Sequence, residues 1–107
     1  MAIVGRIELK TDKDVAKGTE ISLLELFPYA ERVKEFPLEA GVTHGQTRLK
    51  VTVAKLGSID TIADATREKG EKIHLWALMK YGQTSKKIKT LEAIKKDENI
   101  AITVETM

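Results

Sequence analysis

The sequence predicts a small α+β protein with a single four-stranded mixed sheet and about three helices, in the order β-α-β-α-β-α-β. Residues 2–10, 47–56 and 100–106 alternate apolar and polar side chains, as strands with one buried face do. Residues 72–81 are apolar on one alternating face and largely apolar on the other, which is typical of a central strand covered on both sides. Because the connections are short, a small α/β arrangement with parallel neighbours is also compatible with this order.

The bulk composition predicts one compact domain, residues 1–107. A chain of 107 residues is too short to divide into two parts that each bury a core. Hydrophobic residues make up 42% of the chain and the net charge is only +2, so disorder is not expected. We find no internal repeat and no low-complexity segment. The scarcity of Asn and Gln beside many Lys and Glu residues is typical of proteins from hot environments.

The first helical segment is expected between residues 19 and 36. Thr19 or Ser22 can cap its N-terminus, and apolar residues follow at helical spacing. Pro28 removes a backbone donor from the middle of this segment. We therefore expect either a kink or two short helices, the second beginning at Pro28.

The segment 58–69 supports two interpretations. Ser58 is a good N-cap, and acidic residues early in the segment with basic residues late match the dipole of a helix. In the competing interpretation, residues 61–66 form a strand in a hairpin with residues 72–81, as in small OB-like β-barrels. We favour the helix and keep an OB-like barrel with peripheral helices as the alternative. A last helix is expected from residue 84 or 85 to about residue 96.

Known motifs for catalysis and cofactor binding are not found. The chain has neither a glycine-rich phosphate loop nor a nucleophile elbow. It contains no cysteine, which excludes thiolate metal sites and cysteine nucleophiles. His44, in the glycine-flanked loop 37–46, and His74 are far apart in the chain and do not suggest a metal site, although the His44 loop is a candidate for ligand contact. We therefore expect a protein that is not an enzyme and that binds no cofactor or metal.

Positive charge is concentrated in the second part of the chain. Residues 1–45 carry 6 basic and 8 acidic side chains, whereas residues 46–107 carry 12 basic and 8 acidic ones. Lysines neutralise nucleic-acid phosphates, and a tryptophan between basic residues can stack on an unpaired base. The competing interpretation is a solvated lysine-rich surface. The residues predicted to bind DNA or RNA are Arg48, Lys50, Trp76, Lys80, Lys86, Lys87 and Lys89.

The strands expected at residues 2–10 and 100–106 supply an alternative function. If one of them is a sheet edge, it can pair with a second copy or another protein. This predicts a structural, assembly or accessory protein that acts as a homodimer or through a partner. No apolar run approaches the roughly 18–20 residues of a membrane helix, and no signal peptide is visible, so we expect no membrane association and a cytoplasmic location.

Overall fold

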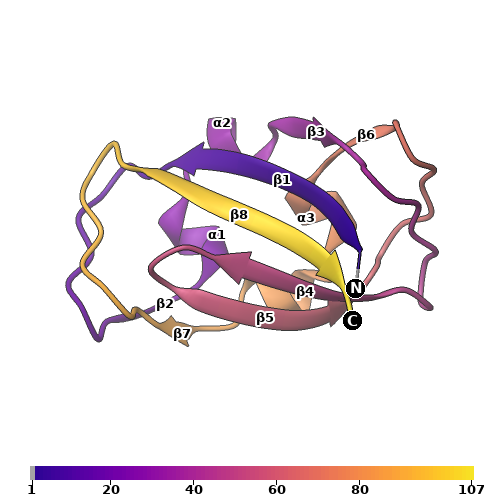
Figure 1. The fold of residues 1–107 in the computed structure, drawn as a ribbon. Helices are drawn as coiled ribbons and strands as arrows, with labels where there is room; N and C mark the ends of the chain where they lie inside the picture. The colour runs from indigo at the N-terminus through magenta and orange to yellow at the C-terminus, as the bar shows by residue number, and fades with distance from the viewer. Residues whose placement is uncertain (1) are drawn as a thin grey trace.

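The computed structural model describes residues 2–107 and contains a four-stranded antiparallel sheet (Figure 1). The strand order is β1-β8-β4-β5, so the two central strands are β8 and β4. Their bounds are β1 Ile3–Lys10, β4 Arg48–Val53, β5 Gly57–Ile62 and β8 Asn99–Thr106. The α+β class and a four-stranded sheet are confirmed, and the strands predicted at residues 2–10, 47–56 and 100–106 correspond to β1, β4 and β8. The prediction of a mixed sheet is wrong, because every neighbouring pair is antiparallel.

Two short ribbons and four single-turn helices complete the fold. Strand β2 pairs with β7, and β3 pairs with β6, so each ribbon joins segments that are far apart in the chain. The ribbon strands are β2 Glu20–Ile21, β3 Glu35–Pro37, β6 Lys72–His74 and β7 Ile88–Lys89. The helices are α1 Leu23–Leu26, α2 Tyr29–Arg32, α3 Leu75–Leu78 and α4 Tyr81–Thr84. Within residues 2–107, the strands close no barrel.

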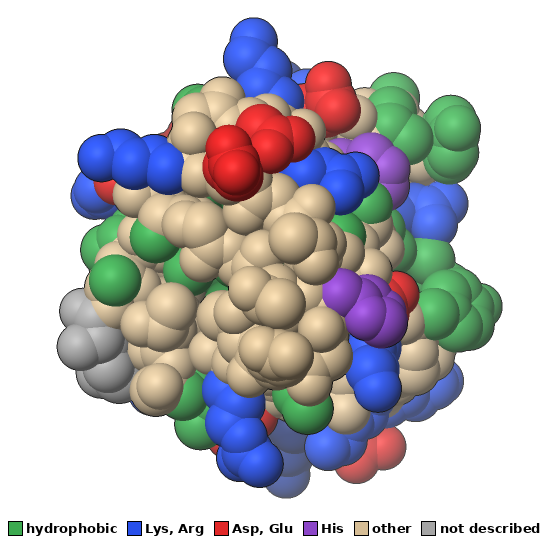
Figure 2. All heavy atoms as spheres, turned by 90° about the vertical axis from the view of Figure 1, so that its right-hand side faces the viewer, with side chains coloured by type: hydrophobic (Ala, Val, Ile, Leu, Met, Phe, Trp, Pro, Cys, Tyr) green, Lys and Arg blue, Asp and Glu red, His purple; other side chains and the backbone are tan. Residues whose placement is uncertain are grey.

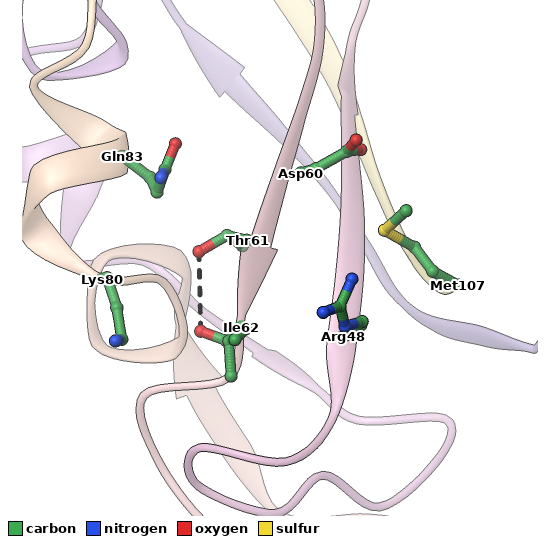
Figure 3. Close-up of a pocket in the computed structure, with 7 residues that line it drawn as sticks. All are labelled: Arg48, Asp60, Thr61, Ile62, Lys80, Gln83 and Met107. Atoms are coloured by element: carbon green, nitrogen blue, oxygen red, sulfur yellow. Dashed lines mark hydrogen bonds between the residues drawn. The ribbon is translucent and has the colours of Figure 1, made fainter.

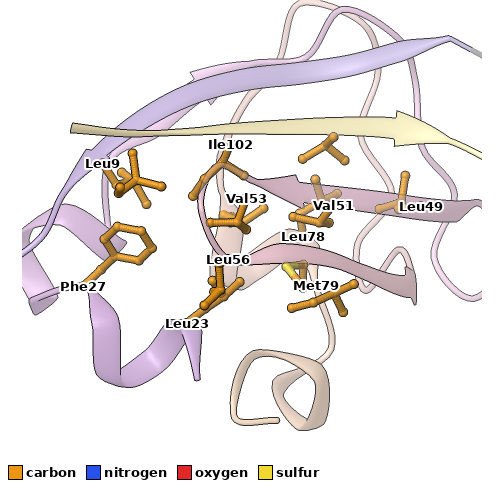
Figure 4. Close-up of a cluster of buried hydrophobic side chains, with 14 of the residues drawn as sticks. Leu9, Leu23, Phe27, Leu49, Val51, Val53, Leu56, Leu78, Met79 and Ile102 are labelled. Atoms are coloured by element: carbon orange, nitrogen blue, oxygen red, sulfur yellow. The ribbon is translucent and has the colours of Figure 1, made fainter. Parts of the chain in front are cut away.

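The hydrophobic core lies between one face of the sheet and the helices (Figure 4). Alternate residues of the two central strands point into it, because successive side chains of a strand project to opposite faces. These inward residues are Leu49, Val51 and Val53 on β4 and Ile100, Ile102 and Val104 on β8. The other face of β4 carries Arg48, Lys50 and Thr52 and is open to solvent. The alternation that predicted these strands therefore reflects a sheet covered on one face.

The prediction of a central strand over residues 72–81 is wrong. Strand β6 ends at His74, whose Nδ1 accepts a hydrogen bond from the Ala77 N–H and caps α3. Leu75, Leu78 and Met79 then reach the core at helical spacing. A short apolar run satisfies both the helical and the strand period, which explains the error.

The segment 19–36 divides at Pro28 into two helices, as expected. Ser22 caps α1 in a reciprocal capping box with Glu25, which fixes the start of the helix. Pro28 is the N-cap residue of α2. The prediction missed the flanking strands β2 and β3, since each is only two or three residues long and owes its conformation to a distant partner.

Both later helix predictions are wrong. Residues 57–62 form β5, which turns back from β4 through Lys55 and Gly57, both at positive φ. The competing strand at 61–66 overlaps only the end of β5. Residues 84–96 contain β7 and a loop in which Ile94 forms an isolated bridge to Val15. In both segments, pairing with another strand, β4 for β5 and β2 for β7, overrides the local helical pattern.

The structure contains an internal repeat, so the expectation of a repeat-free chain is wrong. Helices α1 and α2 begin at residues 23 and 29, and α3 and α4 begin at residues 75 and 81, which is 52 positions later in both cases. If β1 is exchanged with β5, and β4 with β8, the strand order becomes β5-β4-β8-β1, which is the same order read from the other edge of the sheet. We call residues 3–53 the first half and residues 57–106 the second half. Identical residues recur 52 positions apart at Lys17 and Lys69, Gly18 and Gly70, Ile21 and Ile73, Leu23 and Leu75, Leu26 and Leu78, and Tyr29 and Tyr81.

Candidate functional site

Two adjoining hollows follow the free edge of β5, and we call them together the β5 groove. The first has a volume of about 310 Å³ and the second about 470 Å³. Asp60 and Gln83 line both hollows, so the two hollows adjoin at these residues. The remaining lining residues are Arg48, Ser58, Ile59, Thr61, Ile62, Lys80, Lys86, Lys87, Ile88, Lys89 and Met107.

Most of the predicted nucleic-acid-binding residues come together in this groove. Arg48 projects from the start of β4, and Lys80 is the N-cap residue of α4. The chain then runs through three further exposed lysines that end in β7, beside β5. The predicted residues in the groove are Arg48, Lys80, Lys86, Lys87 and Lys89. The last three belong to a loop and a ribbon strand and not to a helix, as was expected.

Lys50 and Trp76, the other two predicted residues, lie outside the groove. Lys50 is opposite Asp60 on one side and Glu105 on the other, so acidic residues flank it in the sheet register. Trp76 is half-buried on α3 and packs edge-on against Phe27, with ring centroids 6.2 Å apart. Its indole packs against the core. The exposed aromatic residue beside the groove is Tyr81, whose exposed fraction is 68%.

The two walls of the groove differ in charge (Figure 3). Gln83 and Lys80 lie on the α4 side of β5, whereas the Asp60 carboxylate, Arg48 and Met107 lie together on the other side. Lys87 Nζ is 3.6 Å from Glu25 Oε1, an exposed ion pair that solvent weakens. Positive charge therefore dominates the α4 wall. Asp60 was not predicted as a lining residue, because residues 58–69 were expected to form a helix.

Backbone groups of β5 also face the groove. In an antiparallel pair, residues that bond to the partner alternate with residues whose N–H and C=O point away. Ala63 N–H donates to the Thr47 carbonyl at 2.9 Å, which places Ile62 in the alternate, outward set. The Arg48 carbonyl, opposite Ile62, accepts from Met107 on the β8 side, in agreement with this phase. The Ile62 N–H is therefore directed toward the α4 side of the edge.

The corresponding edge of the first half is occupied. Lys10 N–H, 52 positions before Ile62, donates to Glu31 Oε1 at 2.7 Å. The Lys34 ammonium donates to the same oxygen at 2.9 Å. These bonds, that from Lys10 most of all, lower the pKa of the Glu31 carboxyl below its ordinary value. This edge of β1 thus stabilises an anion that the chain itself supplies.

Acid is expected to destabilise the fold through Glu31 and Glu25, whose pKa is also lowered, chiefly by the Ser22 N–H. A carboxyl with a lower pKa in the folded state contributes stability above its unfolded pKa, about 4.3, and loses it as pH falls through the folded value. The Tm, followed by circular dichroism from pH 6 to pH 3, should therefore fall less in Glu31→Gln than in the parent. Equal falls would contradict this assignment.

Other candidate sites are weaker. His44 Nε2 lies 3.4 Å from Asp64 Oδ1, but both side chains are well exposed. Figure 2 shows the end of the molecule that faces right in Figure 1, where histidine side chains form two separate patches among scattered charges. Within residues 2–107, no three His, Asp or Glu side chains form a group that could hold a metal ion.

Comparison with known proteins leaves the groove as the main guide to function. No helix within residues 2–107 is long and apolar enough to cross a membrane. No protein-family model matches the chain, and neither a curated protein nor a solved structure matches it.

Proposed function

We propose that this protein binds nucleic acid, without catalysis, by gripping phosphates in the β5 groove. The observation that supports this function best is the arrangement of four lysines and one arginine along two adjoining hollows. Lysine ammonium groups neutralise backbone phosphates and release counterions, which accounts for most non-specific affinity. The Gln83 amide and the Ser58 hydroxyl add neutral groups of the kind that bond to phosphate oxygens.

A second candidate is an accessory protein that acts through the edge of β5. Among the described residues, β5 pairs only with β4, so its outer edge can accept a strand from a second copy or from another protein. The β1 edge is less open, because the Val4 carbonyl accepts from Glu39 N–H and Lys10 N–H donates to Glu31. Light scattering after size-exclusion chromatography, with and without nucleic acid, distinguishes self-association from the leading proposal.

Alanine at Lys86, Lys87 and Lys89 together is expected to weaken nucleic-acid binding. Fluorescence anisotropy with labelled single- and double-stranded DNA and RNA, at about 50 and 200 mM salt, measures the effect. With three to five phosphate contacts, the parent should lose roughly one to three decades of affinity across this range. The triple variant should bind more weakly at low salt and show a shallower salt dependence, because it makes up to three fewer contacts.

The matched control changes three exposed lysines outside the groove, Lys13, Lys69 and Lys72, to alanine. It removes the same charge and should keep most of the affinity. Equal losses in the two triple variants would show that net charge alone attracts the nucleic acid. Flat titrations of the parent at micromolar protein would reject nucleic-acid binding and direct attention to the β5 edge.

A further inference from the structure

The repeat places equivalent hydrogen-bond donors at two sheet edges, but only in the first half does a carboxylate of the chain bind to them. Glu31 of α2 corresponds to Gln83 of α4, and Lys10 of β1 corresponds to Ile62 of β5, each 52 positions later. Lys34 corresponds to Lys86 in the same way. The two edges thus share a backbone N–H and a lysine, and they differ in the acidic residue.

In the first half, the Glu31 carboxylate lies between these two donors. It accepts from the Lys10 N–H at 2.7 Å and from the Lys34 ammonium at 2.9 Å. Hydrogen bonds to an ionised acceptor are among the strongest in proteins, and two of them define one position for an anion. The lowered pKa of Glu31 is consistent with this stabilisation of negative charge.

In the second half, the chain supplies no carboxylate at that position. Gln83 is neutral, and among the described residues no side chain bonds to the Ile62 N–H. The groove opens there, with Gln83 lining both of its hollows. The surroundings are also more basic than in the first half, because Lys80 occupies the position that corresponds to Pro28, and Lys87 the position that corresponds to Glu35. The position that the Glu31 carboxylate occupies in the first half is therefore open in the second half, where positively charged side chains surround it.

We propose that a phosphate group of the bound nucleic acid occupies this position, held by the Ile62 N–H and the Lys86 ammonium. Lys80 contributes further positive charge, and the Gln83 amide can donate to a phosphate oxygen. The Asp60 carboxylate also lines both hollows, but it lies on the other side of β5 from Gln83, with Arg48 (Figure 3). This inference rests on the proposed function and specifies one contact point within it.

The decisive variant is Gln83→Glu, which gives the second half the acidic residue of the first. The new carboxylate should bond to the Ile62 N–H and to Lys86, as Glu31 does in the first half, and so exclude phosphate. We expect oligonucleotide affinity to fall by about tenfold, the effect of losing one charge-assisted contact. The matched control is Gln46→Glu, which adds the same charge at the only other glutamine, an exposed residue outside the groove. It should change affinity much less.

Backbone NMR spectra provide a readout at the site itself. Titration of the parent with inorganic phosphate, at constant ionic strength, should shift the Ile62 amide resonance, and a single-stranded oligonucleotide should shift it further. Gln83→Glu should abolish both responses, and Gln46→Glu should preserve them. A response to phosphate without one to the oligonucleotide would identify free phosphate as the ligand and overturn this proposal.

Other outcomes separate this inference from the proposed function. If the oligonucleotide binds through the lysines while the Ile62 amide stays unshifted, the phosphate position is wrong and nucleic-acid binding stands. If polyglutamate shifts the Ile62 amide and oligonucleotides do not, the groove takes an acidic peptide and both proposals fail. Equal losses of affinity in Gln83→Glu and Gln46→Glu would also overturn the assignment, because only overall charge would then matter.

Discussion

Truncating Phe27 to alanine is expected to lower the free energy of unfolding by about 3–5 kcal/mol, the usual range for a buried phenylalanine. Phe27 is 2% exposed and contacts the edge of Trp76, so the change leaves a cavity and removes an aromatic pair. Because small domains have only about 5–15 kcal/mol of stability in total, the variant should retain little of it. Urea denaturation followed by tryptophan fluorescence measures the change directly, since Trp76 is the single tryptophan.

The repeat supplies a matched control for this experiment. Met79 occupies the corresponding position of the second half and is fully buried there. Phe27→Met should therefore cost less than about 1.5 kcal/mol, because it keeps most of the apolar volume. If Phe27→Ala and Phe27→Met destabilise equally, the loss does not come from the cavity, and the packing argument is wrong.

Replacing Gly5 with alanine is expected to destabilise the protein by about 1–3 kcal/mol, the usual cost of overpacking a core. A β-carbon at Gly5 would lie 2.6 Å from Cδ2 of Phe36 and closer still to Cε2. Phe36 is buried and paired within the β3–β6 ribbon, so its ring has little room to move away. Thermal and urea denaturation of Gly5→Ala would show a lower Tm and a lower midpoint.

A second-site change tests the cause. At the corresponding place in the second half, Gly57 faces Ile88, and a β-carbon there would stay 3.8 Å from it. Adding Phe36→Ile to Gly5→Ala should therefore relieve the clash and recover part of the lost stability. Gly82→Ala, with no atom near its added carbon, should be close to neutral. Failure of Phe36→Ile to rescue any stability would show that Phe36 is not the obstacle.

The sequence predicted β1, β4 and β8, which bury one regular face, and failed for β5 and for the short strands that pair with distant segments. Leu49, Val51 and Val53 alternate with polar residues, and that pattern alone identifies β4. Nothing local distinguishes β7, whose two residues are strand only because Glu20 and Ile21 lie beside them. The repeat was missed although six residues of positions 17–29 recur 52 positions later, because the first segment was expected to be a helix and the second a strand.

The sequence predicted which residues line the candidate site better than it predicted how they are arranged. The excess of lysine over residues 80–89 indicated which side chains would gather. Their placement beside β5 could not be predicted, because residues 58–69 were assigned to a helix and β5 was absent from the expected fold. Trp76 was placed with them because residues 72–81 were expected to form a strand, in which Trp76 and Lys80 lie on the same face. Its actual position on α3 turns the ring toward Phe27.

The position of β8 determines when this sheet can form during synthesis. Strand β8 follows all the other strands in the chain, yet it lies between β1 and β4 and pairs with both. A nascent chain that ends before Asn99 has made β1 and the β4–β5 hairpin but lacks the strand that joins them. Until that strand leaves the ribosome, β1 and β4 each expose an unpaired edge, the kind of surface that promotes misassociation. We therefore expect native structure to appear in one step once β8 has been made, with little stable structure in chains that end before Asn99.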